Sequence, residues 1–187
     1  YYQQQADYKM QLTLDDSKQI LRGTEVITYT NNSPDALDYL WLQLDQNLFA
    51  KDSDTKLITV EKMEDFRSIS SIERRLFDYD GGFKIEEVKA LNGADMDYSI
   101  NKTMLRIDLK QALKTNSSIS FKIKWWYNIN DRMAVGGRSG YEYFKDEDNY
   151  IYTIAQFFPR MCVYDDVSGW QNKQFLGRGE FTLPFGN

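Results

Sequence analysis

Apolar residues alternate with polar ones over long stretches of this chain, and this period of two constrains its fold most. Between residues 21 and 29, for example, one alternating set is Leu21, Gly23, Glu25, Ile27 and Tyr29. A period of two is typical of a β-strand with one face against a core. The predicted strands are residues 8–14, 21–30, 37–44, 83–89, 95–100, 104–109, 118–127, 150–158 and 175–185.

Turn residues separate these strands and predict how they connect. Asn92-Gly93 is the strongest hairpin signal, because both central positions of a type I′ turn need a positive φ. We therefore expect residues 83–109 to form a three-strand meander. The polar stretch 46–80 lacks clean alternation and favours one or two short helices, near 54–67 and 70–77. Residues 1–187 are expected to form one all-β domain, an antiparallel β-sandwich of two or more packed sheets.

Composition excludes several classes of function. The chain has 187 residues, no histidine and a formal net charge of −5. Without histidine it cannot contain a Ser-His-Asp triad, a Cys-His dyad or a His-ligated zinc site. The acidic balance, with no basic stripe, argues against nucleic acid as a partner. No stretch approaches the roughly 20 apolar residues of a membrane span, and the single cysteine, Cys162, forms no disulfide within the chain.

Gln156 is the residue of the chain for which a purely structural role is hardest to assign. It lies within the predicted aromatic strand 150–158, which Pro159 ends. A buried amide must be hydrogen-bonded, so Gln156 either braces neighbouring backbone or faces a cleft. The aromatic runs 125–127 and 157–158 favour core packing over sugar stacking. At the far end, Phe181, Leu183 and Phe185 alternate up to a turn at Gly186-Asn187, and we expect the natural chain to continue beyond it.

Several motifs resemble one enzyme family, in the order expected along the whole chain. Residues 153–161 (Thr-Ile-Ala-Gln-Phe-Phe-Pro-Arg-Met), followed by Tyr164-Asp165-Asp166 and Gly169-Trp170, resemble the end of the N-terminal domain of M1-family zinc aminopeptidases, in their Bacteroidetes-type branch. The opening agrees in residues 1–8 and 29–40, and the later part in residues 125–132 and 136–142.

This resemblance implies a saddle-like β-domain that packs against a thermolysin-like catalytic domain. That domain carries the zinc, a His-Glu-x-x-His helix and a Gly-x-Met-x-Asn loop, and this chain has neither motif. The resemblance therefore implies no catalytic residue, no metal ligand and no cofactor within residues 1–187. Gln156 matches the family's glutamine that reaches into the active-site cleft, so we expect it to bind substrate. Phe158 stands where many members have an acidic residue that holds the substrate's free amine.

The partners implied by the resemblance are the protein's own C-terminal catalytic domain and a peptide substrate. The family suggests a periplasmic, cell-envelope or secreted location, with the cytoplasm as the alternative. Two other hypotheses remain: a free-standing β-sandwich binding module for carbohydrate or protein, and a scaffold domain whose peptidase partner has degenerated.

Overall fold

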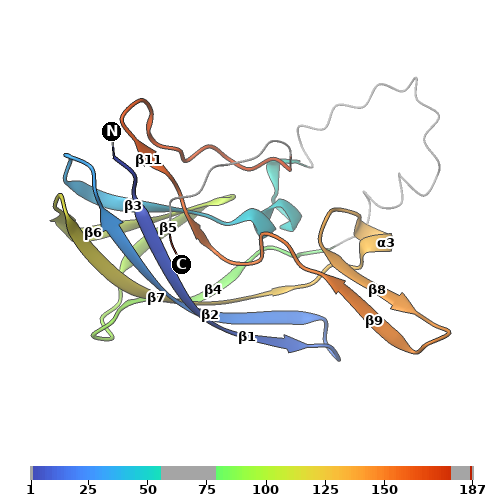
Figure 1. Ribbon diagram of the computed structural model, residues 1–187. Coiled ribbons are helices and arrows are strands. Elements are labelled where there is room, and N and C mark those ends of the chain that lie inside the picture. Colours follow the sequence, from blue (N-terminus) through green and yellow to red (C-terminus); the bar gives the residue numbers. More distant parts are fainter. Residues whose placement is uncertain (1, 56–78, 178–185, 187) are drawn as a thin grey trace, which may run out of the picture.

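The computed structural model describes residues 2–55, 79–177 and 186, and in them two antiparallel sheets face each other across one core (Figure 1). Sheet A has the order β1-β2-β7-β4, and sheet B has the order β10-β3-β6-β5. The predicted all-β sandwich is confirmed. The strands of sheet A are β1 (Gln5–Asp15), β2 (Ile20–Asn31), β7 (Ser117–Asn128) and β4 (Lys84–Ala90). Those of sheet B are β10 (Arg160–Met161), β3 (Leu37–Gln43), β6 (Met104–Leu113) and β5 (Asp97–Asn101).

Two small sheets complete the described strands. One pairs β8 (Gly140–Phe144) with β9 (Asn149–Thr153), and the other pairs β11 (Tyr164–Asp165) with β12 (Gly169–Trp170). The helices that lie wholly in the described part are the 3-10 helix η1 (Asp45–Phe49) and α3 (Arg132–Val135), and residues 54–55 are also helical. The Asp131 carboxylate caps α3 by accepting from two backbone N–H groups. In the described residues, no helix has the length and apolarity that a membrane crossing would need.

The alternation along β2 and β7 forms the core face of sheet A. On β2, every second residue from Leu21 to Asn31 is buried, and on β7 the buried set includes Phe121, Ile123 and Trp125. The two strands pair in continuous register, with Ile27 opposite Phe121. Sheet B contributes Leu40, Leu42, Leu105 and Ile107 to the same core. Burial of these side chains from water stabilises the sandwich.

Gly23 lets the Trp125 ring pack directly on the backbone of β2. The two residues are opposite each other in the ladder, and a Cβ at Gly23 would lie 2.2 Å from a ring carbon of Trp125. The indole also stacks on Tyr127, with ring centroids 6.0 Å apart, and meets Phe83 edge-on at 5.4 Å. A side chain at position 23 would displace this aromatic cluster from the sheet.

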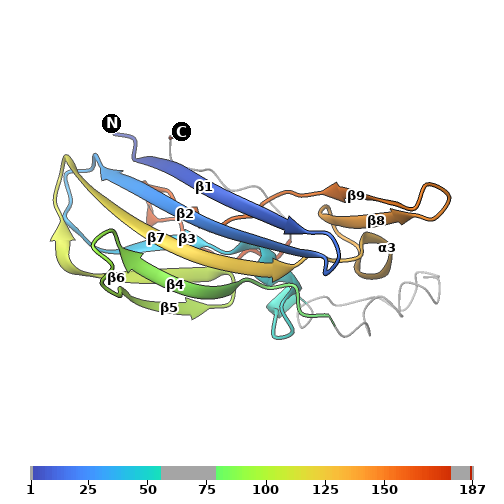
Figure 2. The ribbon, with the colours of Figure 1, turned by 90° about the horizontal axis from the view of Figure 1, so that it is seen from below.

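One end of the β1–β2 hairpin is less buried than its alternation predicts. Leu12 and Leu14 face inward with Gly23 and Leu21, yet they are 46% and 43% exposed. Figure 2 shows the reason, because β1 and β2 extend beyond the strands of sheet B. The apolar face at this end therefore has less of the molecule packed on it.

The predicted meander of residues 83–109 is wrong, because its strands belong to two sheets. β4 pairs with β7 in sheet A, whereas β5 pairs with β6 in sheet B. The turn at Asn92-Gly93 exists, but only Gly93 has a positive φ, of 86°, so it is not type I′. Hydrogen bonds from Gly93 N–H to Ala90 O and from Ala90 N–H to Ala94 O are typical of a type I turn followed by a left-handed glycine. After the single bridge between Lys89 and Asp95, the chain crosses to the other sheet.

Two further expectations are tested only in part. Of the helices predicted near 54–67 and 70–77, residues 54–55 are helical and the rest lie outside the described residues; η1 is a further short helix at the start of this stretch. The predicted last strand, residues 175–185, has no strand structure through residue 177, and its remainder also lies outside them.

Candidate functional site

Gln156 does not lie on a strand, which corrects the sequence prediction. β9 ends at Thr153, and Gln156 follows it with a φ of 52°. This left-handed conformation costs a residue with a side chain roughly 1–3 kcal/mol, so surrounding contacts must hold it. The side chain is half-buried, and its amide nitrogen lies 3.5 Å from Oδ1 of Asp45, at the outer limit of a hydrogen bond.

Two side chains from distant parts of the chain hold the backbone around Gln156. Gln46, on η1, donates from Nε2 to the carbonyl oxygens of Ala155 at 3.0 Å and of Gln156 at 3.2 Å. The Ser139 hydroxyl accepts from the N–H of Ala155 and donates to its carbonyl, both at 3.1 Å. Gln46 and Ser139 are themselves buried. This bracing holds the backbone from which the Gln156 side chain extends.

A buried ion pair lies beside Gln156. Arg160 Nη2 is 2.7 Å and Nε 2.9 Å from Oδ2 of Asp45, and a second bond from Nη2 reaches Oε1 of Gln43 at 3.3 Å. The side chains of Arg160 and Asp45 are 10% and 1% exposed. Burial raises the pKa of Asp45, and the guanidinium opposes that rise. The pair joins β10 to η1 and places a carboxylate oxygen next to the Gln156 amide.

Phe158 belongs to the packing of this region. Its ring meets Tyr8 edge-on with centroids 5.3 Å apart and meets Phe157 at 5.0 Å. The Tyr8 hydroxyl accepts from the Met161 N–H at 2.9 Å, and burial raises the pKa of Tyr8. An aromatic ring in this position offers no charge to hold an ammonium group, although its face can attract a cation.

The arrangement presents one amide, Gln156, on a rigid backbone with an ion pair behind it. Such a group can donate to a carbonyl or accept from an amine, and it supplies neither a nucleophile nor a general base. Sequence reasoning singled out Gln156, whose role stays a prediction, and it did not single out Asp45, Gln46 or Ser139. No local pattern marked these three, because they reach Gln156 only through the fold.

The residues of the described part do not fit a zinc site. No group of three or more Cys, Asp, Glu or His residues lies close enough together there to hold a metal ion. Cys162 is buried, which raises the pKa of its thiol to about 12 and opposes formation of the thiolate that zinc binds. We therefore derive no metal chemistry from these residues.

Glu25 is a second unusual group, in the core of the sandwich. Its side chain is fully buried between Met10 on β1 and Ile123 on β7, and neither carboxyl oxygen has a hydrogen-bond partner in the described structure. Burial raises the pKa of Glu25 well above 4.5, because nothing compensates the loss of water. Glu25 therefore favours its protonated form.

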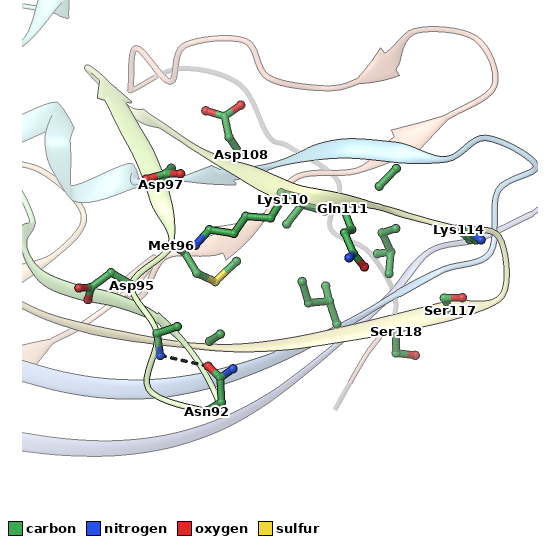
Figure 3. A pocket seen from close by; sticks show the side chains of 16 residues that line it. Asn92, Asp95, Met96, Asp97, Asp108, Lys110, Gln111, Lys114, Ser117 and Ser118 are labelled. Atoms are coloured by element: carbon green, nitrogen blue, oxygen red, sulfur yellow. Dashed lines mark hydrogen bonds between the residues drawn. The ribbon is translucent and has the colours of Figure 1, made fainter.

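A groove of about 570 Å³ opens between the sheets near the β4–β5 turn (Figure 3). Met96, Leu109 and Ile119 give it an apolar lining, and the exposed residues Asp97 and Lys110 also line it. None of the residues lining it belongs to the segment around Gln156. The groove is therefore separate from the candidate site.

Comparison with known proteins gives similarity only to solved structures. No family model and no curated protein matches the sequence. Three similar structures are of M1 zinc metallopeptidases: a point mutant from Deinococcus radiodurans bound to a Tyr-Ser-Ala substrate, a second structure of that mutant, and a two-domain mutant bound to L-tryptophan. Each has a TM-score of 0.40 and 10% identity over 68% of this chain. The chain spans 20% of their length, and a similarity of this degree does not establish a shared activity.

Proposed function

We propose that this chain is the non-catalytic N-terminal domain of an M1-like zinc metallo-aminopeptidase. In this role it covers a catalytic domain and contributes Gln156 to the cleft that binds the N-terminal residue of a peptide. The zinc and its ligands would belong to that other domain. The motifs from residues 153 to 170 support the family, and the all-β fold agrees with the domain that the motifs imply.

The braced conformation of Gln156 is the observation that carries this proposal. A left-handed, non-glycine residue held by Gln46 and Ser139 is costly, and such strain concentrates at functional sites. A peptide end is recognised by fixed polar groups in a cleft, and a rigid amide meets this need. Because Phe158 carries no charge, we propose that any acidic group that holds the substrate's amine comes from the catalytic domain.

The test uses the complete product of the gene. Gln156→Ala is expected to lower kcat/KM on aminoacyl substrates by about tenfold or more, the loss of one hydrogen bond to a charged group. The zinc content should not change. Gln111→Ala is the matched control, since Gln111 is exposed and lines the separate groove. Equal kcat/KM values for the two variants would show that Gln156 does not bind substrate. A complete gene product without a zinc-ligand motif would contradict the peptidase assignment.

The alternative function is a free-standing β-sandwich binding module for carbohydrate or protein. Exposed aromatic side chains on β8 and β9 favour this alternative, because such residues are typical of contact surfaces. In that case, the complete gene product would contain no catalytic domain.

A further inference from the structure

The β8–β9 hairpin projects beyond the ends of β1 and β2 (Figures 1 and 2). In the described structure it forms a sheet of two strands, and an isolated hairpin of this kind is only marginally stable in water. Both of its faces expose apolar groups: Ile151 is 54% exposed on one face and Tyr143 is 48% exposed on the other. A hairpin with this much exposed apolar surface is suited to contact another molecule.

Four tyrosines line one face of this hairpin. The ladder places Tyr141 opposite Tyr152 and Tyr143 opposite Tyr150. The rings of Tyr143 and Tyr150 are closest, with centroids 4.9 Å apart. At the base, the Tyr152 hydroxyl donates to Oε1 of Gln19, so the row is anchored to the β1–β2 turn and becomes exposed toward its tip.

The outer edge of β9 is open. β9 pairs with β8, and in the described part of the chain no strand pairs with its other side. The N–H of Tyr150 donates to Oδ1 of the adjacent Asn149, which indicates that it faces away from β8. The close approach of the Tyr143 and Tyr150 rings agrees with a pair that exchanges no backbone hydrogen bonds. An open edge of this kind accepts a further strand from another chain.

The charge at the tip selects the kind of partner. The turn contains Asp146, Glu147 and Asp148, and no Lys or Arg of the described part forms a salt bridge with them. Lys145 supplies one opposing charge, so the turn is net negative. Tyrosine faces and carboxylates both attract cations. The same edge of a second copy carries no lysine or arginine, because β9 is Asn-Tyr-Ile-Tyr-Thr, so it does not complement this negative charge.

We propose that β9 is the acceptor edge for an extended segment of a partner protein that carries lysine or arginine at alternate positions. The segment adds as a third strand through the backbone groups of Tyr152 and of Tyr150, whose N–H exchanges the Asn149 side-chain oxygen for a carbonyl of the segment. Its cationic side chains lie over the tyrosine row near the acidic turn, and its apolar side chains contact Ile151. This proposal is independent of the peptidase assignment.

The test titrates this protein with a synthetic peptide of about ten residues that alternates lysine and valine, long enough to cover one strand. Backbone amide resonances are followed by NMR. We expect the shifts to concentrate in β8 and β9. A glutamate–valine peptide, and a lysine–valine peptide N-methylated on its pairing edge, should both fail to bind. Equal binding of the N-methylated peptide, or shifts centred on the open edges of β1 or β5, would overturn the proposal.

Charge variants separate a specific contact from bulk attraction. The double variant Asp146→Asn with Glu147→Gln should raise the Kd of the lysine–valine peptide by about fivefold, which is the effect expected from removing two partly screened charges. Asp95→Asn with Asp97→Asn makes the same change in net charge at the separate groove and should alter affinity by less than about twofold. Equal losses in the two variants would contradict the proposal. The proposal would also be contradicted if a neutral oligosaccharide shifted the resonances of the hairpin while the lysine–valine peptide did not bind.

Discussion

Replacement of Glu25 by glutamine tests whether an unpaired carboxyl group in the core limits the stability of the sandwich. The pKa of Glu25 in the folded state is raised by burial, whereas in the unfolded chain it returns to its ordinary value near 4.5. Below the unfolded pKa, both states hold the proton and the group costs nothing extra. Between the two pKa values only the folded state holds it, so stability falls as the pH rises, and the loss levels off above the folded pKa.

The slope of this loss has a fixed upper limit. One group that is protonated only in the folded state lowers the free energy of unfolding by at most about 1.4 kcal/mol per pH unit. The difference between Glu25→Gln and the wild type is therefore expected to grow by up to about 2.7 kcal/mol from pH 5 to pH 7. A buried glutamine amide has its own hydrogen-bonding cost, but that cost does not change with pH. The change with pH of the difference in unfolding free energy therefore tests the argument, whereas the difference at any one pH does not.

Urea unfolding at pH 5, 6, 7 and 8, followed by tryptophan fluorescence, measures this difference, because Trp125 is buried in the same core. Glu147→Gln is the control, because it makes the same chemical change at an exposed turn outside the core. If the stability of Glu25→Gln relative to the wild type does not increase with pH, Glu25 is either solvated or paired in the folded protein. That outcome would refute the argument from burial.

Two further substitutions test the packing and the ion pair. Gly23→Ala places a Cβ against the Trp125 ring and should cost about 1–3 kcal/mol, measured as a lower midpoint of thermal unfolding; an unchanged midpoint would show that the ring moves freely. Arg160→Met leaves the Asp45 carboxylate buried without its partner and should cost about 3–5 kcal/mol in urea unfolding. A second change, Asp45→Leu, should recover part of that loss, and additive losses would show that the pair does not interact.

Alternation in the sequence predicted most strands because a buried face leaves a period of two. β2 and β7 are long and central, so their inner faces are continuously buried, and even Glu25 falls in the buried set. At the edge strand β1, the same pattern overstated burial at Leu12 and Leu14. The sequence predicted strands better than partners, since an Asn-Gly turn does not reveal that β4 and β5 belong to different sheets.

The candidate site was predicted only in part. Tyr150, Tyr152 and Ile154 alternate, so the predicted strand continued through Gln156, whereas the chain leaves extended structure after Thr153. The groups that hold this conformation are distant in sequence, with Asp45 111 positions before Gln156. Contacts of this separation depend on the complete fold and have no local signal.

The pairing of β2 with β7 determines when sheet A can assemble on the ribosome. The hydroxyls of Thr28 and Ser120, 2.8 Å apart in the finished sheet, are separated by 92 positions in the chain. At about 5–20 residues per second, β7 is synthesised about ten seconds after β2. During that interval Leu21, Ile27 and Tyr29 of β2, which are buried in the finished core, lack the strand that pairs with β2 on this side.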